Sequence, residues 1–321
     1  MGAERMHALY EDCRLCPRDC GVDRLQGERG YCGENARMRV AWAGLHRGEE
    51  PPLVGENGSG TIFFSGCTLK CGSCQNCQIS HRGIGREVSG EELQRLALCL
   101  QEAGAANINL VTASHFTPSI VESISGARQR AMRIPVVWNS SGYENLSAID
   151  LLRETVDVYL PDCKTLDGSV SRQLMGAADY PEVVRPALLK MVEDKPLIVE
   201  EGQIQQGVIV RHLVLPGLLD QSREVLEWFA GELRDRALLS LMFQYTPVLF
   251  DRGKADGNPR RTVSLREHDQ VLSWLEELGI DNGYVQDPAE NDDWLPDFTR
   301  VNPFPKGQAV PIWHYQTGTV G

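Results

Sequence analysis

One loop carries four closely spaced cysteines, Cys67, Cys71, Cys74 and Cys77. The loop follows a short apolar run, residues 61–64, that ends in Ser65-Gly66. Thiols this close together cannot easily pair as disulfides, because a bridge needs Cα atoms roughly 4.4–6.8 Å apart and suitably aimed Cβ vectors. They can converge on a metal centre, because thiolates are soft ligands suited to zinc and to iron–sulfur clusters. The loop therefore predicts a metal centre at the end of a strand.

The spacing of the first three cysteines, Cys67-x-x-x-Cys71-x-x-Cys74, resembles the signature of the radical S-adenosylmethionine (SAM) enzymes. Three thiolates on a four-iron cluster leave one iron open to a small molecule. One alternative is a structural zinc or an electron-transfer cluster that uses Cys77 as its fourth ligand. Another is a shifted register, in which Cys71, Cys74 and Cys77 bind the cluster.

A second group of cysteines precedes the loop: Cys13, Cys16, Cys20 and Cys32. A Cys-x-x-Cys pair followed by two more thiols indicates a metal site with four ligands. Spacing alone does not separate zinc from a second iron–sulfur cluster. Because four ligands close the coordination sphere, we expect a metal-pinned N-terminal cap, with an auxiliary cluster that relays electrons as the alternative.

Beyond the loop, strand-like and helix-like segments alternate. Two capping boxes, Ser89 with Glu92 and Ser264 with Glu267, predict helix starts. Alternation repeated about six times implies parallel strands joined by right-handed crossovers, and the length favours a partial (β/α)6 barrel of the α/β class. Strands are expected near 61–64, 108–112, 134–138, 156–160, 208–215 and 239–243, and helices near 119–132, 146–153 and 181–193.

Three domains are predicted: a cysteine-rich cap over 1–57, the barrel over 58–287, and a C-terminal tail over 288–321 that packs on the barrel. We expect residues 44–60 to form a linker and residues 163–180 to be irregular. The tail's aromatic residues are expected to hold it against the barrel. Cys99 is expected in or near the core.

The predicted strands end in polar residues, and the carboxyl ends of parallel barrel strands carry the chemistry of such folds. Hydroxyl and amide groups suit the ribose and amino group of SAM, and a guanidinium suits its carboxylate. The candidate cofactor-binding residues are Thr112, Ser114, His115, Asn139, Ser141, Arg211 and Gln244, and the candidate catalytic residues are Asp162, Cys163 and Lys164.

The order of several motifs resembles the radical SAM proteins described as pyruvate formate-lyase-activating enzymes. These motifs include Cys13-x-x-Cys16-Pro-Arg-x-Cys20-Gly-Val, Ser65-Gly-Cys67, Asn139-x-x-Gly142-Tyr143, Leu160-Pro-Asp162, Arg211-His-Leu-Val-Leu-Pro-Gly217 and Met242-x-Gln244-Tyr245. The resemblance implies that Cys67, Cys71 and Cys74 hold a 4Fe–4S cluster and that SAM binds its open iron. It also implies an electron donor such as a flavodoxin or ferredoxin, and hydrogen abstraction from a glycyl-radical enzyme as protein substrate.

The resemblance assigns SAM contacts to Asn139 and Arg211, and places Asp162 and Lys164 toward the substrate. Thr112, Ser114 and His115 stand where relatives carry a Gly-Gly-Glu type segment for the SAM amino group. Cys163 has two interpretations, a packing residue or a thiol within reach of substrate. Radical SAM modification of a small molecule or peptide, and a non-catalytic electron-transfer protein, are the alternative functions.

The composition sets outer limits on partners. The chain is 42% hydrophobic and 24% charged, as expected for a globular protein. A net charge of −12 argues against nucleic-acid partners and against anionic membranes. Ten cysteines without a recognisable export signal read as metal ligands in a reducing compartment, so a cytoplasmic location is expected.

Overall fold

The computed structural model describes residues 3–248, 258–288 and 295–320. Its strands are β1 (Arg39–His46), β2 (Ser59–Phe64), β3 (Arg86–Glu87), β4 (Ile108–Val111), β5 (Val136–Ser140), β6 (Val158–Pro161), β7 (Ile198–Glu200), β8 (Gln203–Leu213), β9 (Leu238–Met242), β10 (Gly283–Gln286), β11 (Ala309–His314) and β12 (Gly318–Thr319). Its α-helices are α1 (Ala3–His7), α2 (Pro51–Val54), α3 (Cys77–Ser80), α4 (Gly90–Glu102), α5 (Thr117–Gln129), α6 (Leu146–Leu152), α7 (Gly168–Met175), α8 (Tyr180–Asp194), α9 (Leu219–Glu232) and α10 (Leu265–Glu277). Two 3-10 turns, η1 (Ala8–Tyr10) and η2 (Ser114–Phe116), complete them.

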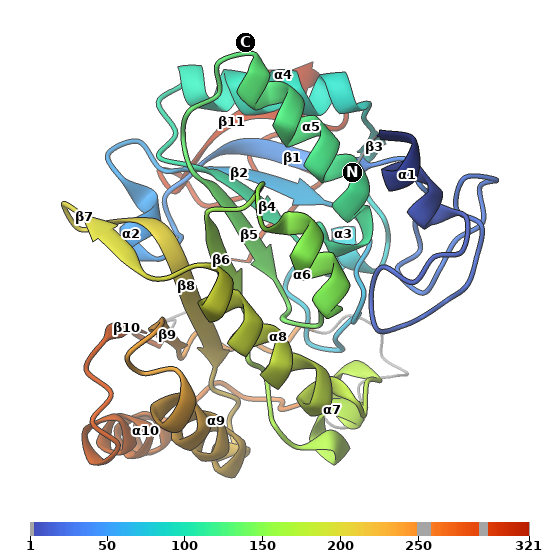
Figure 1. Cartoon of the computed structure of the whole chain (residues 1–321). Coiled ribbons are helices and arrows are strands. Elements are labelled where there is room, and N and C mark those ends of the chain that lie inside the picture. Colours follow the sequence, from blue (N-terminus) through green and yellow to red (C-terminus); the bar gives the residue numbers. More distant parts are fainter. Residues whose placement is uncertain (1–2, 249–257, 289–294, 321) are drawn as a thin grey trace.

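The strands form one open sheet in the order β10-β9-β8-β6-β5-β4-β2-β1-β11-β12. From β2 to β10 neighbouring strands are parallel, whereas β1 and β11 add antiparallel strands at the other edge. The connecting helices cover the outer face of the sheet, as Figure 1 shows. The mixed α/β class with parallel strands is therefore confirmed. A partial barrel is consistent with this sheet, whose described strands do not close into a ring.

The helices begin where their sequence signals lie. Ser89 caps α4 and Ser264 caps α10, each with a complete capping box. Apolar residues then recur at helical spacing on α4, and Leu93, Leu96 and Leu100 enter the main core between helices and sheet. Both predicted helix starts are confirmed, because a capping box satisfies the first backbone N–H groups locally and needs no tertiary context.

Two predictions about segments and one about a residue were wrong. The expected linker, residues 44–60, contains the end of β1, α2 and the start of β2. The expected irregular stretch, 163–180, contains α7, capped by Asp167 and ended by Gly176 in the left-handed region. Cys99 is exposed, because its position on α4 faces away from the apolar stripe.

The C-terminal tail packs on the sheet through backbone pairing. β11 pairs antiparallel with β1, which itself pairs with β2. Phe298 and Phe304 contact Phe63 and Trp42 on this face. β1 lies within the range predicted as the cap, so the sheet includes part of residues 1–57. Trp294, also expected to anchor the tail, lies outside the described residues.

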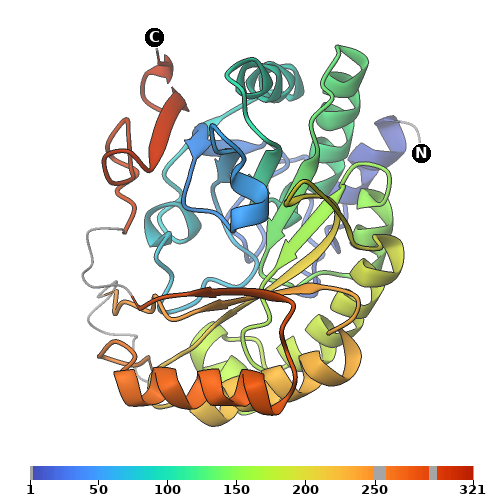
Figure 2. The same ribbon diagram turned by 90° about the vertical axis from the view of Figure 1, so that its left-hand side faces the viewer.

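In the N-terminal segment, residues 11–38 contain turns and loops without a helix or strand. Tyr10 fixes this segment to α5 through a hydrogen bond to Ser119 of 2.9 Å. Figure 2, turned by 90°, shows α9 and α10 side by side at the bottom of the view, whereas the N-terminus lies at its upper right. In the described ranges, no helix combines the length and the apolar character needed to cross a bilayer.

Candidate iron–sulfur and SAM site

The cysteine loop begins directly after β2. Gly66 follows with φ of 81°, in the left-handed region, and a Cβ there would lie 2.9 Å from the carbonyl oxygen of Cys32. Only glycine fits both conditions without strain. The turn at Gly66 thus directs Cys67 away from the strand and against the N-terminal segment.

The structure groups the first three thiols of the loop. Burial raises the pKa of Cys71 to about 12, and the neighbouring Cys67 and Cys74 thiols add to the shift. Burial raises the pKa of Cys74 to about 11, again with a contribution from Cys67. The pKa of Cys77 is raised by its own burial, with Arg82 opposing. This grouping favours the register Cys67, Cys71, Cys74 over the shifted one.

Hydrogen-bond donors point at two of these sulfur atoms. The backbone N–H groups of Leu69 and Lys70 lie 3.4 and 3.5 Å from Cys67 Sγ, and the Ser80 hydroxyl donates to Cys74 Sγ at 3.3 Å. Donors aimed at sulfur stabilise the thiolate, which is the ligand form of cysteine.

The donor set fits an iron–sulfur cluster better than a single ion. Within the described part of the chain, no three His, Cys, Asp or Glu side chains converge as ligands of one metal ion would. The thiolates of a four-iron cluster each bind a different iron, so they need not meet at one point. The three grouped thiols with their N–H and O–H donors therefore fit a 4Fe–4S cluster.

A charged network lies beside the loop, at the carboxyl ends of β5, β6 and β8. Asp162 Oδ1 lies 3.0 Å from Arg211 Nε, and its Oδ2 lies 2.6 Å from Lys164 Nζ. Arg211 also donates to the Asn139 side-chain oxygen at 2.6 Å. Burial opposes ionisation of Asp162, but the Arg211 and Lys164 cations prevail and lower its pKa.

The network and the cysteine loop belong to one site. Burial works to lower the pKa of Lys164, but Asp162 and the Cys71 thiol outweigh it and raise that pKa well above its usual value. In return, Lys164 lowers the pKa of Cys71. In this network two cations, Arg211 and Lys164, share one carboxylate, Asp162.

The segment after β4, predicted to bind SAM, makes internal contacts that hold the fold. Thr112 adopts a φ of 59°, which is unfavourable for a β-branched residue, and its N–H donates to the Asn139 carbonyl. Ser114 and His115 are buried: Ser114 donates to Glu144, and His115 Nε2 lies 2.8 Å from the Ser65 carbonyl oxygen. Burial lowers the pKa of His115 to about 3, so the ring is neutral and bonds to the backbone before the cysteine loop.

Cys163 is fully buried in the main hydrophobic core, and burial raises the pKa of its thiol to about 12. Its carbonyl oxygen lies 2.7 Å from His212 Nδ1, whose Nε2 lies 2.9 Å from the Ser222 hydroxyl. These facts agree with the packing interpretation of Cys163 rather than with a reactive thiol.

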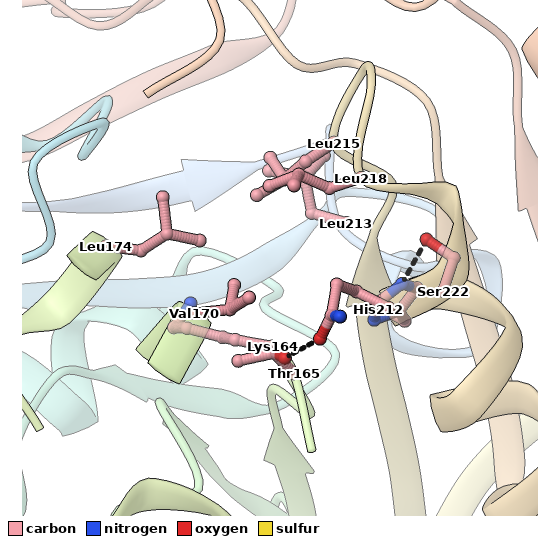
Figure 3. Close-up of a pocket in the computed structure, with 10 residues that line it drawn as sticks. Lys164, Thr165, Val170, Leu174, His212, Leu213, Leu215, Leu218 and Ser222 are labelled. Carbon is pink, nitrogen blue, oxygen red and sulfur yellow. Dashed lines mark hydrogen bonds between the residues drawn. The ribbon is translucent and has the colours of Figure 1, made fainter. Parts of the chain in front are cut away.

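Figure 3 shows the small pocket beside Lys164 and His212. Its volume of about 10 Å³ is close to the volume that one water molecule requires.

Tyr180, at the start of α8, is a site residue that the sequence did not reveal. Its hydroxyl oxygen lies 2.8 Å from the Ser141 carbonyl oxygen and 2.9 Å from that of Asp162, and it accepts the Lys164 N–H. It thus links the ends of β5 and β6.

The predicted site residues Ser141 and Gln244 are both half-buried. Ser141 directly follows β5, and Gln244 lies two residues after β9.

Two carboxyl groups beneath Arg211 were also missed, because their burial depends on tertiary packing. Glu50 accepts a hydrogen bond from Ser240 on β9, and burial raises its pKa to about 7. Glu49 Oε1 lies 3.5 Å from His46 Nδ1. Burial alone would raise the Glu49 pKa, but the interaction with His46 is stronger and lowers it. Both carboxylates interact with Arg211, so the guanidinium has acidic groups on two sides.

A thiol loop after a parallel strand, with a charged network at the neighbouring strand ends, defines an α/β protein built around an iron–sulfur centre. Residues 54–175 match the model of the 4Fe-4S single cluster domain. This range contains the cysteine loop and the strand ends up to Lys164, and the match confirms the prediction of a 4Fe–4S cluster.

Known proteins are similar over most of the chain. An uncharacterised protein of Methanocaldococcus jannaschii is 29% identical over 283 residues, covering 85% of this chain and 77% of that protein. Streptococcus suis SuiB, solved with SAM bound, has a TM-score of 0.50 at 12% identity, covering 69% of this chain and 48% of its own. A radical SAM methyltransferase from Sphaerobacter thermophilus has a TM-score of 0.46 at 15% identity, covering 78% of this chain and 70% of its own.

The chain therefore spans about half the length of SuiB. The family model supports the predicted 4Fe–4S cluster, and the similarity to SuiB supports the fold.

Proposed function

We propose that the protein is a radical SAM enzyme that removes a hydrogen atom from a glycyl residue of a protein partner, as an activase of a glycyl-radical enzyme. The observation that carries the proposal is the Asp162–Lys164–Arg211 ion network at the strand ends. An electron carrier needs a cluster, but it does not need an ion network at the strand ends beside that cluster.

Cys67, Cys71 and Cys74 would hold the cluster. When bound, the cluster and SAM supply a one-electron reductive cleavage that yields methionine and a 5′-deoxyadenosyl radical, with the electron from a flavodoxin or ferredoxin. Arg211 offers a guanidinium to the SAM carboxylate, and Asn139 offers an amide beside it. Asp162 and Asn139 already hold the Arg211 side chain, so its guanidinium group would be oriented before SAM binds.

Asp162 and Lys164 would face the substrate. Their mutual ion pair keeps Lys164 protonated and holds its position, which suits the binding of a substrate carbonyl. The proposed substrate class follows from the motif resemblance around Leu160-Pro-Asp162 and Arg211. Modification of a small molecule or free peptide is the alternative.

The first experiment tests the enzyme class. Protein reconstituted anaerobically with iron and sulfide receives dithionite and SAM, and 5′-deoxyadenosine and methionine are quantified by mass spectrometry. We expect both products from the wild type and from Cys99→Ala, a control at an exposed cysteine, and none from Cys71→Ala. Intact SAM in the loaded wild type would refute the class.

The second experiment tests the substrate. Candidate glycyl-radical enzymes are added to the loaded protein, and electron paramagnetic resonance is recorded. A glycyl radical signal that requires SAM supports the activase proposal. Deoxyadenosine formation without a radical on any partner would favour the small-molecule or peptide route.

A further inference from the structure

The N-terminal cysteines are not used by the proposed reaction, yet the fold brings them together. Cys13, Cys16 and Cys32 are buried, Cys20 is half-buried, and the Cys16 thiol interacts electrostatically with the other three. Backbone hydrogen bonds hold the turns that carry them, from Cys13 N–H to the Val22 carbonyl and from Asp19 N–H to the Cys16 carbonyl, both 3.1 Å. Thiols distant by up to nineteen positions in sequence (13 to 32) thus form one cluster in space.

Donors also point at these sulfur atoms. The Tyr31 backbone N–H donates to Cys20 Sγ at 3.3 Å, and the Arg24 guanidinium lies 3.6 Å from Cys13 Sγ. A backbone N–H from Arg18 reaches Cys16. A neutral thiol is a weak acceptor, so this many donors fit sulfur that is ionised and bound to a metal.

A buried cation lies against these sulfur atoms. Arg24 is 1% exposed, and its guanidinium is the group that contacts Cys13 Sγ. If the cysteines are bound to a metal as thiolates, this guanidinium offsets part of their charge and the metal centre supplies the rest.

The segment that carries these cysteines also makes hydrogen bonds to the loop that begins at Cys67. The Cys32 carbonyl accepts the Cys67 N–H at 3.3 Å. Arg18 donates to the Thr68 carbonyl at 2.8 Å, and the Tyr31 hydroxyl donates to the Leu69 carbonyl at 3.2 Å. Residues adjacent to or within the four-cysteine group therefore fix three consecutive residues of the loop that begins at Cys67.

We propose that Cys13, Cys16, Cys20 and Cys32 bind a second, closed tetrathiolate metal centre, and that this centre positions the backbone of the loop that begins at Cys67. Zinc and an iron–sulfur cluster share this ligand chemistry. These thiols do not converge as the ligands of one metal ion would, so the geometry favours a cluster over a single zinc ion, as it does for the Cys67 loop. The metal-binding part of the proposal is independent of the proposed reaction.

The test uses the full chain, purified anaerobically from medium containing both iron and zinc. Metals are measured by mass spectrometry and sulfide chemically, for the wild type, Cys20→Ser, Cys71→Ser and the control Cys99→Ser. We expect the wild type and Cys99→Ser to hold, beyond the catalytic cluster, about one zinc, or about four iron and four sulfide, per chain. Cys20→Ser should lose this extra centre, whereas Cys71→Ser should lose the catalytic cluster and keep the extra one.

A second readout covers the case in which Cys20→Ser does not fold. In the wild type, the four N-terminal thiols should resist alkylation until a chelator is added, while Cys99 reacts throughout. Absence of metal beyond the catalytic cluster, or two disulfides among the four residues, would overturn the proposal.

The positioning role is measured separately, as the rate at which a chelator bleaches the catalytic cluster. We expect several-fold faster bleaching in Cys20→Ser than in Cys99→Ser. Loss of the N-terminal metal with an unchanged bleaching rate would refute the positioning part and leave a site without influence on the loop.

Discussion

The Asp162 network offers a direct test of the site's electrostatics, through Asp162→Asn. The exchange keeps the shape of the side chain but leaves Lys164 and Arg211 facing each other without their common anion. Removing one partner of a fully buried pair costs about 3–5 kcal/mol. Asp162 and Arg211 side chains are each 18% exposed and Lys164 is 30% exposed, so we expect the lower end, about 3 kcal/mol.

The sign of the pH dependence follows from the lowered pKa of Asp162. A carboxyl group whose pKa is lower in the folded state contributes stability above its unfolded pKa and loses it as the pH falls through the folded pKa. The difference between the wild type and Asp162→Asn should therefore be full at pH 7 and shrink under strongly acidic conditions.

The assay is urea unfolding of the cluster-free protein, followed by circular dichroism. Asp235→Asn is the matched control, because Asp235 is 90% exposed and should respond little. Adding Lys164→Met to Asp162→Asn should recover part of the loss, since one uncompensated cation is removed. Equal urea midpoints for Asp162→Asn and the wild type at pH 7 would refute a coupled charge network.

Three further predictions concern single residues. Cys77→Ser should retain the 4Fe–4S absorption and the SAM cleavage of the wild type, and loss of both would restore the shifted register. Glu50→Gln should stabilise the cluster-free fold by on the order of 3 kcal/mol at pH 8 and by much less at pH 4. The reason is that the folded-state pKa of Glu50 is raised to about 7, so the wild type loses stability as the pH rises from about 4.5. Equal effects at both pH values in urea unfolding would contradict this. Ser264→Ala should cost about 1 kcal/mol through the lost cap of α10, and an unchanged urea midpoint would show that the cap is not used.

The parts of the fold that the sequence predicted are those set by local signals. The capping boxes at Ser89 and Ser264 mark the starts of α4 and α10, and a short apolar run identifies β2 before the cysteine loop. α7 carried comparable signals, since Asp167 caps its start and Gly176 ends it, but its eight residues have too short an apolar stripe to stand out.

The pairing of β1 with β11 could not be predicted in the same way. Trp42 pairs with His314, and no local pattern at either residue identifies a partner so distant in the chain. The same limit applies to Glu50, whose burial beneath Arg211 depends on the packing of α2 against β8. From the sequence alone, a carboxylate in a Pro-rich segment is expected to be exposed to solvent.

The candidate site shows why whole-chain charge is a poor guide to local chemistry. The chain has a net charge of −12, yet a cation interacts with each thiol group: Arg24 with Cys13, and Lys164 with Cys71. Thiolate ligands give an iron–sulfur centre negative charge, and each electron added increases it. If these cysteines hold such a centre, buried cations beside them would make its reduction less costly, because net charge and hydrogen bonds set cluster potentials. The acidic excess on the surface leaves this balance intact, since charges beyond a Debye length are screened by solvent and salt, whereas these buried groups are not.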